Sequence, residues 1–296
     1  PWRLVVDHWA IIIKKEIIKC YPDFIFPIKK YSFLNTIDVD NAYAYLEKGF
    51  LRNLGGFFRD LIKNNDPLNR LKVLFKLSKD PYDNYSKLLF LNKKYNLNTI
   101  FFFLLADYGF NDKNTPVTSR KFNELIKEIS DYCKVGLHTS YASLTSKNKL
   151  NIELKRLNNI FHKEILNSRQ HFIKLNMPNM YRNLIKHGIK NDFSMGFASL
   201  PGFRAGTCSK FSFYDLDLES ETDLNILPFS IMDVTLNEYM NLSPSEALDT
   251  IKGIVDEIKK VDGTFVSIWH NESLDYDRRW HGWNNIYEEM IKYANK

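Results

Sequence analysis

The 296-residue sequence has few of the features that mark disulfide-stabilised or membrane-embedded proteins. It contains only three cysteines, Cys20, Cys133 and Cys208, which lie far apart and form no CxxC pair. This spacing argues against a disulfide framework and against a thiolate zinc site, so we expect reduced thiols. The longest apolar runs, at 98–106 and 10–13, fall well short of the roughly 18 residues that a membrane helix needs. We therefore predict no membrane span.

Signals of targeting and of domain division are also missing. The sequence begins without methionine and without a signal-type segment, so we interpret its start as the cut edge of a longer protein. Its localisation stays open, although unpaired cysteines favour the cytoplasm. No repeat, low-complexity tract or Gly/Ser linker divides the chain. We expect an N-terminal flange, or the remnant of a preceding domain, at residues 1–30 and one main domain at 31–296.

Charge of one sign is not concentrated in any segment. The net charge is +6, but the lysines are spread through helical segments and offset by nearby acids, as in 127–131 and 256–260. This distribution predicts a solvated surface and not a stripe that follows a nucleic-acid backbone. We expect no nucleic-acid partner, and the oligomeric state stays open.

The hydrophobic residues, 44% of the chain, can build a full core, and their spacing predicts strands that alternate with helices. The expected strands are 33–40, 98–105, 134–138, 168–172, 189–194, 225–229 and 264–270. The expected helices are 50–63, 68–77, 85–95, 119–132, 149–166, 178–187, 243–261 and 283–294. Repeated strand–helix units predict an α/β fold with a mostly parallel sheet, closed as a barrel or left open. The stretch 45–81 is long for one crossover, so we expect a helical insertion above the barrel mouth.

Polar side chains stand at the ends of four predicted strands. Asp38 and Asp40 share one face of the first strand, about 7 Å apart along the backbone, because strand side chains alternate. The other strand ends carry His138, Arg169 with His171, and His270. Each residue alone has a structural explanation, such as a cap, a turn or a buried pair. Together they predict one shared site, since catalytic residues of a parallel barrel come from several strand ends.

The residue types at these strand ends suit metal and acid–base chemistry. A buried Arg169 beside Asp38 would orient that acid and depress its pKa. Neutral imidazoles are good ligands for zinc, iron or cobalt, and His270 suits a general acid. A cluster of three tryptophans, Trp269, Trp280 and Trp283, is typical of core packing but also fits a rim on which sugars stack.

Six segments of the chain resemble the polysaccharide deacetylases with a NodB-homology domain, over roughly residues 32–296. They are TIDVDNAYAY (36–45), GLHTSYAS (136–143), SRQHF (168–172), GFRAGTC (202–208), PFSIMDVTL (228–236) and SIWHNESL (267–274). The resemblance implies a distorted parallel (β/α)7 barrel. It also implies a metal-dependent hydrolase that removes acetyl groups, bound to nitrogen or oxygen, from a polysaccharide or oligosaccharide.

The resemblance also assigns roles to individual residues. It implies that Asp38 is the catalytic base, that Asp40 and His138 bind the metal, and that His270 protonates the leaving group. Two further residues have supporting roles, in which Arg169 steadies the base and Asp233 holds His270. The expected substrate contacts are Asn41, Tyr43, Arg204, Trp269 and Glu272, of which Arg204 would suit a carboxylate on an acidic polysaccharide.

The second motif departs from the family pattern. The family has another histidine four residues after the first, but this chain has Ala142 there. Catalytic zinc normally keeps three protein ligands, so Asp40 and His138 are too few. We hypothesise that His171 is the third ligand of a divalent metal, with zinc favoured and cobalt, nickel or iron as alternatives. A degenerate barrel without catalysis is the other interpretation.

Two other classes of function fit parts of the sequence. The Asp-Val-Asp motif also occurs in metal-dependent glycosyltransferases, although no glycine-rich phosphate turn accompanies it here. A non-catalytic carbohydrate-binding barrel would use the tryptophan cluster and would not depend on Asp38.

Overall fold

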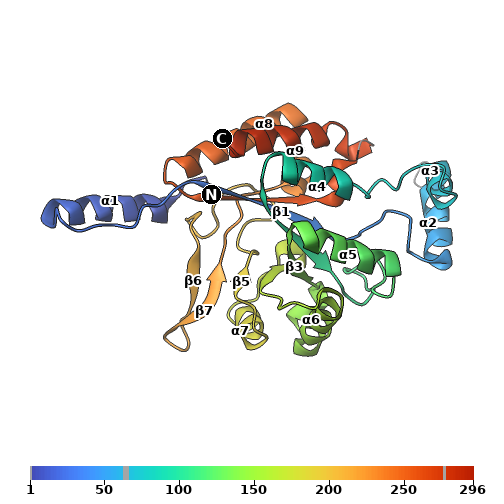
Figure 1. Cartoon of the computed structure of the whole chain (residues 1–296), viewed down its shortest axis with the longest axis horizontal. Helices are drawn as coiled ribbons and strands as arrows, with labels where there is room; N and C mark the ends of the chain where they lie inside the picture. Colours follow the sequence, from blue (N-terminus) through green and yellow to red (C-terminus); the bar gives the residue numbers. More distant parts are fainter. Residues whose placement is uncertain (1, 63–66, 276–277) are drawn as a thin grey trace.

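The computed structural model describes residues 2–62, 67–275 and 278–296 (Figure 1). Its strands are β1 (Ser32–Val39), β2 (Asn98–Leu104), β3 (Lys134–Thr139), β4 (Asn167–Gln170), β5 (Asn191–Asp192), β6 (Phe211–Asp215), β7 (Ser220–Ile226), β8 (Ile231–Met232) and β9 (Thr264–His270). They form one sheet in the order β6-β7-β5-β4-β3-β2-β1-β9-β8. Neighbouring strands are parallel, except in the antiparallel β6–β7 hairpin.

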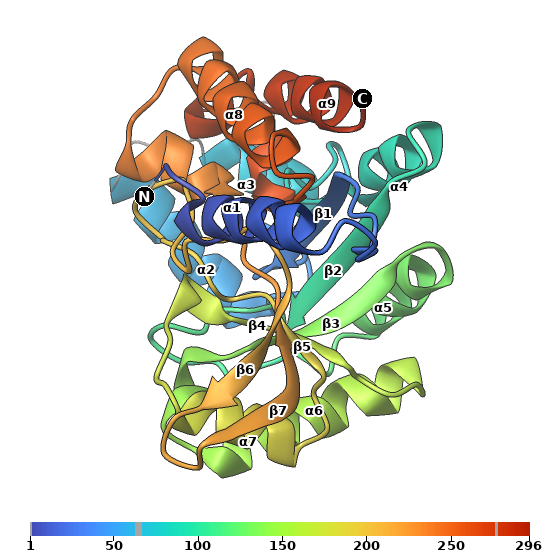
Figure 2. The same ribbon diagram turned by 90° about the vertical axis from the view of Figure 1, so that its left-hand side faces the viewer.

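The helices surround this sheet and extend beyond both ends of it. They are α1 (Val5–Cys20), α2 (Phe50–Ile62), α3 (Pro67–Leu74), α4 (Tyr85–Lys94), α5 (Arg120–Tyr132), α6 (Lys147–Phe161), α7 (Asn179–Lys186), α8 (Pro244–Lys259) and α9 (Trp283–Ala294). Helices α4 to α9 cover the outside of the strands (Figure 2). Helices α2 and α3 form the expected insertion, and α1 projects at the opposite end of the molecule (Figure 1). None of the described helices has the length and apolarity to cross a bilayer.

One extended segment joins the two edges of the sheet. Residues 227–230 connect β7, near one edge, directly to β8 at the other. The Leu227 amide donates to the Asp192 carbonyl at 2.9 Å, whereas the Ser230 amide donates to the Val266 carbonyl at 3.1 Å. The segment thus reaches from β5 to β9 and curls the sheet into a distorted barrel whose ladder is interrupted at this seam.

The inward and outward faces of the strands carry different side chains. On β1, Ile37 and Val39 face the outer helices and belong to the main core. A second apolar cluster, which includes Leu34, Phe102 and Ile268, fills the inside of the barrel. Because side chains alternate, the inward positions of β1 after Leu34 are Thr36, Asp38 and Asp40. The barrel interior is therefore apolar at its floor and polar at its mouth.

Most of the predicted elements form, with shifted boundaries. The predicted strand 168–172 is wrong at its end, because His171–Ile173 form a 3₁₀ turn in which Phe172 and Ile173 have φ values of 58° and 53°. The predicted strand 225–229 is β7 displaced toward the N-terminus, and the β6–β7 hairpin is absent from the prediction. Lys63, the last residue of one predicted helix, lies outside the described residues. The division into residues 1–30 and 31–296 stays a prediction.

Candidate metal and acid–base site

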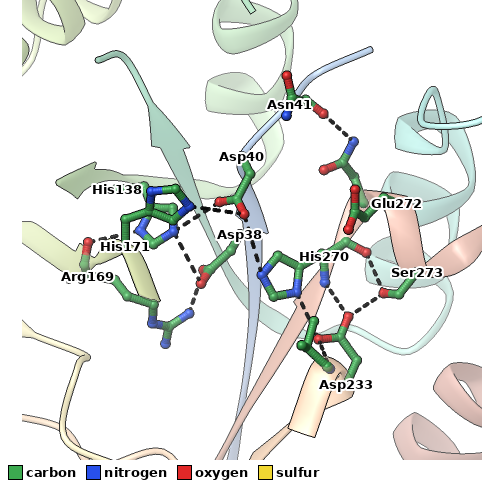
Figure 3. Close-up of polar contacts among 12 residues, drawn as sticks. Asp38, Asp40, Asn41, His138, Arg169, His171, Asp233, His270, Glu272 and Ser273 are labelled. Carbon is green, nitrogen blue, oxygen red and sulfur yellow. Dashed lines mark hydrogen bonds and ion pairs between the residues drawn. The ribbon is translucent and has the colours of Figure 1, made fainter. Parts of the chain in front are cut away.

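The predicted strand-end residues meet at the mouth of the barrel (Figure 3). On one side of Asp38 and Asp40 lie His138, His171 and Arg169, and on the other side lies His270 with Asp233. Strand register brings them together, because Asp38 on β1 lies opposite His270 on β9, and His138 on β3 lies opposite Arg169 on β4. Asp38 and His138 are each 1% exposed, and Arg169 is fully buried. The structure therefore brings the polar residues of these strand ends together, and their roles stay predictions.

Asp40, His138 and His171 form a candidate metal site. Each offers one ligand atom, and these atoms lie within 4.8 Å of one another. The Asp40 carboxylate stands between the two imidazoles, with Oδ1 3.1 Å from His138 Nε2 and Oδ2 3.4 Å from His171 Nε2. Burial disfavours the charged carboxylate, but the two imidazoles outweigh it and hold the pKa of Asp40 well below its usual range.

The hydrogen bond of His138 leaves a conflict that a cation would resolve. Its Nδ1 lies 2.9 Å from the Arg169 carbonyl, which can only accept, so Nδ1 carries a proton. When Nε2 carries no proton, as metal binding requires, it presents a lone pair to Asp40 Oδ1, and no other described residue donates a hydrogen bond to either buried atom. Two facing acceptors repel each other. A divalent cation bound to both would remove this repulsion, so the residues present fit a metal.

Asp112, which the sequence analysis missed, orients His171. Its Oδ1 lies 2.9 Å from His171 Nδ1, and the amides of Tyr141 and Ala142 donate to the same carboxylate at 2.9 and 3.2 Å. A carboxylate behind a ligating histidine fixes the ring and raises its basicity. Although burial opposes protonation, Asp40 and Asp112 raise the pKa of His171 to about 9 in the absence of metal. Ala142, which departs from the family motif, thus contributes through its backbone.

Asp38 is held by Arg169 as predicted. The guanidinium Nη1 donates to Asp38 Oδ1 and to Thr36 Oγ1, both at 2.7 Å, while Nε donates to the Phe193 carbonyl at 3.1 Å. These bonds occupy one oxygen of the Asp38 carboxylate. The other oxygen, Oδ2, lies 3.8 Å from His138 Nε2 and faces the metal-ligand cluster.

His270 and Asp233 form a second buried pair across the mouth. His270 Nδ1 lies 2.8 Å from Asp233 Oδ1, and the His270 amide and the Ser273 hydroxyl donate to Oδ2. Burial disfavours the imidazolium, but the Asp233 carboxylate prevails and raises the pKa of His270 well above its ordinary value. Its Nε2 is 4.0 Å from Asp40 Oδ2. A protonated imidazole therefore points toward the candidate metal site.

The expected substrate contacts divide into two groups. Asn41 and Glu272 lie at the mouth, beside Asp40 and His270 (Figure 3). Trp269 and Tyr43 lie in the main core, 0% and 2% exposed, so the structure contradicts their expected roles. Trp269 precedes the inward-facing His270, and alternation turns it outward against α9. Arg204 is exposed and donates to the Gly196 carbonyl at 3.2 Å, not to a member of the cluster.

The tryptophan cluster is core and not a rim. Trp280 and Trp283 are each 2% exposed, and Trp283 packs against both Trp269 and Trp280. This burial removes the feature on which the non-catalytic carbohydrate-binding interpretation depended.

A buried acid on α6 braces the loop that holds Asp112. Glu153 is 1% exposed and accepts a hydrogen bond from the Ser140 amide at 3.1 Å, directly before the turn that carries Tyr141. Burial raises the pKa of Glu153 to about 7. In the folded state it therefore binds a proton more tightly than in the unfolded chain, and stability falls as the pH rises toward 7.

This linkage gives a testable pH dependence for Glu153→Gln. The glutamine keeps an acceptor for the Ser140 amide but does not titrate. Relative to the parent protein, the variant should gain about 3 kcal/mol of unfolding free energy between pH 5 and pH 8. Urea unfolding of both proteins at the two pH values measures this gain. An unchanged difference would show that Glu153 does not bind the extra proton.

The fold, but not the sequence, is similar to known proteins. No family model and no curated protein matches the sequence. A protein from Mycobacterium smegmatis assigned as a polysaccharide deacetylase superposes with a TM-score of 0.59 at 15% identity, over 92% of this chain and 86% of the other. A 4-alpha-glucanotransferase from Thermococcus litoralis gives 0.51 at 9% identity, over 90% of this chain and 38% of the other. A polysaccharide deacetylase from Bacillus cereus gives 0.43 at 12% identity, over 90% and 88%.

The likenesses to the Mycobacterium smegmatis and Thermococcus litoralis structures establish the fold and leave the chemistry to the site. A fold can host unrelated functions, and the first two of these structures illustrate it. The chain has the mostly parallel α/β fold of the Mycobacterium smegmatis structure, which confirms the fold class expected from the sequence.

Proposed function

We propose that the protein is a metal-dependent hydrolase that removes acetyl groups from a polysaccharide or oligosaccharide. The observation that carries this proposal is the Asp40–His138–His171 cluster, in which His138 bonds a carbonyl through Nδ1 and turns Nε2 toward a carboxylate. The cluster lies between a buried acid held by arginine and a protonated imidazole held by aspartate. A metal site, a base and an acid thus share one barrel mouth.

Asp40, His138 and His171 would hold the metal. One carboxylate oxygen and two imidazole nitrogens suit zinc, and also cobalt, nickel or iron, and three protein ligands leave a coordination position open. When bound, the cation would polarise the acetyl carbonyl and lower the pKa of water toward about 7. Asp112 and the Arg169 carbonyl would keep the two imidazoles in the tautomers that ligation requires.

The remaining residues would move and hold protons. Asp38 Oδ2 would accept the proton of the attacking water, while Arg169 keeps the carboxylate turned toward the cluster. The His270 imidazolium would donate from Nε2 to the departing sugar nitrogen or oxygen, and Asp233 would keep Nδ1 protonated. The geometry separates the two roles, because each group has its own buried partner.

The same contacts argue against a glycosyltransferase. In that class both acids of an Asp-Val-Asp motif would serve the cation and its diphosphate. Here Arg169 takes one oxygen of Asp38, and His270 and Asp233 would have no assigned role.

The metal site is tested through His171. We expect His171→Ala to lose most of its bound metal, because two ligands remain where a tight site needs three. Elemental analysis of the purified proteins measures it, with His187→Ala as the control, since His187 directly follows α7 and donates from Nδ1 to the Asn183 carbonyl. Full metal retention in His171→Ala would remove His171 from the ligand set. Absence of metal from the parent protein, even after incubation with zinc, would contradict the proposed function.

A further inference from the structure

A cavity of about 830 Å³ opens beside the candidate metal site, under the helical insertion. Asn41, which directly follows Asp40, lines it together with Tyr82 and residues of α2 and α3. Its charged lining is one-sided. Two carboxylates, Asp60 and Asp275, face six cations: Lys48, Arg52, Arg59, Arg70, Lys113 and Arg279.

Three of the six cations have carboxylate partners, and the first of them, Arg59, places Nη2 3.8 Å from Asp60 Oδ1. Arg70 is 3% exposed and donates from Nε and Nη2 to Asp60, at 3.0 and 2.6 Å. Arg279 bonds Glu238 and donates to Glu272 at 2.9 Å. These pairs hold the insertion together and join the cavity wall to the loop after His270. They leave other cations of the lining to be explained.

Neither Arg52 nor Lys48 has a hydrogen bond or an ion pair to a carboxylate among the described residues. Arg52 stacks on the Tyr108 ring at 3.5 Å and donates from Nη1 to the Asn114 carbonyl, but its Nη2 is buried without an acceptor. No hydrogen bond or ion pair of Lys48 is found within the described ranges. Burial lowers the pKa of Lys48 to about 8, and the charges of Arg70 and Arg52 add to this effect, although Asp80 and Glu272 oppose it. An unpaired guanidinium nitrogen and a desolvated ammonium are costly unless an anion joins them.

Two residues connect the cavity to the candidate catalytic groups, because Asn41 of the lining follows Asp40, and Glu272 lies beside His270 (Figure 3). Glu272 accepts from Arg279 at the cavity wall, and the charges of Asp40 and His270 act on the same carboxylate. A sugar whose acetyl group lay at the metal site would therefore extend past Asn41 and Glu272 into the basic lining. Resting on the proposed function, we propose that this cavity is an anion subsite, which selects acetylated glycans that carry a carboxylate or a phosphate near the acetylated sugar.

The subsite predicts a preference that depends on Lys48 and Arg52. The parent protein should have a higher kcat/KM on an acetylated oligouronate or a phosphorylated N-acetyl oligosaccharide than on a neutral N-acetylglucosamine oligomer. In Lys48→Gln with Arg52→Gln the ratio of acidic to neutral kcat/KM should fall at least about tenfold. Lys155→Gln with Lys186→Gln, at exposed positions on α6 and α7, also removes two positive charges and is the charge-matched control, which should keep the ratio. Comparing the two acidic substrates distinguishes carboxylate from phosphate.

Direct binding separates this inference from the proposed function. Calorimetry with glucuronate and with inorganic phosphate should show that at least one of these anions binds the parent protein. Its dissociation constant should be at least about tenfold higher for the double variant. If no acetylated substrate is hydrolysed but this difference is found, the proposed function fails and the anion site stands. If neither anion binds, or the double variant binds as the parent does, the anion site is wrong. The melting temperatures of the single and double variants show whether a loss of anion binding results from unfolding.

Discussion

Replacing Asp38 with asparagine should lower turnover about 10²–10⁴-fold while the protein keeps its metal. Asparagine preserves an oxygen for Arg169 but has no carboxylate to accept a proton from water. Asp40, and not Asp38, lies between the two imidazoles, so ligation should survive. Turnover on an acetylated glycan and metal content are the measurements.

The control for Asp38→Asn is Asp192→Asn. Asp192 is also a fully buried acid near Arg169, but its hydrogen bonds are with Ser168 and Ser194. This variant should keep most of its turnover, and thermal melting of both shows whether either is unfolded at the assay temperature. Loss of metal from Asp38→Asn would make Asp38 a ligand, and wild-type turnover would end its assignment as base.

His270→Ala should slow amide hydrolysis about 10²–10⁴-fold and have much less effect on activated aryl acetates. An amine or sugar alkoxide leaves only after protonation, whereas a nitrophenolate needs no acid. The measurement is kcat/KM for an N-acetyl oligosaccharide and for 4-nitrophenyl acetate, in the same preparations.

A companion variant separates the loss of the acidic proton from the loss of the side chain that bonds Asp233. His270→Asn keeps an N–H for Asp233, which otherwise loses the partner at 2.8 Å, and should behave as His270→Ala does. Equal losses on both substrates would show that His270 organises the site and does not act as its acid.

The sequence predicts the strand-end residues well because a strand has a simple geometric rule. Side chains alternate, and parallel strands end at one edge, so Asp38, His138 and His270 could be placed together without coordinates. The same rule would have placed Trp269 outside the site, since it precedes His270 on β9. The apolar face of a strand and a sugar-stacking surface use the same residues, and composition does not distinguish them.

The parts that the sequence does not predict depend on loops. Asp112 lies between β2 and α5, outside any regular element, and its role follows from where the chain folds back on His171. The orientation of His171 depends on a turn in which Phe172 has a positive φ, which strand periodicity does not anticipate. Likewise the basic cavity brings residues of the insertion beside Asp275, Arg279 and Trp280. No local sequence pattern predicts this contact between distant segments.

The pairing of β1 with β9 suggests that the site assembles in two stages during folding. The Ser32 and Thr264 hydroxyls that meet across these strands are 232 positions apart, so this contact closes most of the chain into a loop. Such distant pairings form late, because the entropy of closure must be met first. Asp40, His138 and His171 all come from the segment through β4 and its turn, and can gather before β9 arrives. While the chain folds, the three candidate ligands can therefore lie together before His270, the candidate acid, reaches them.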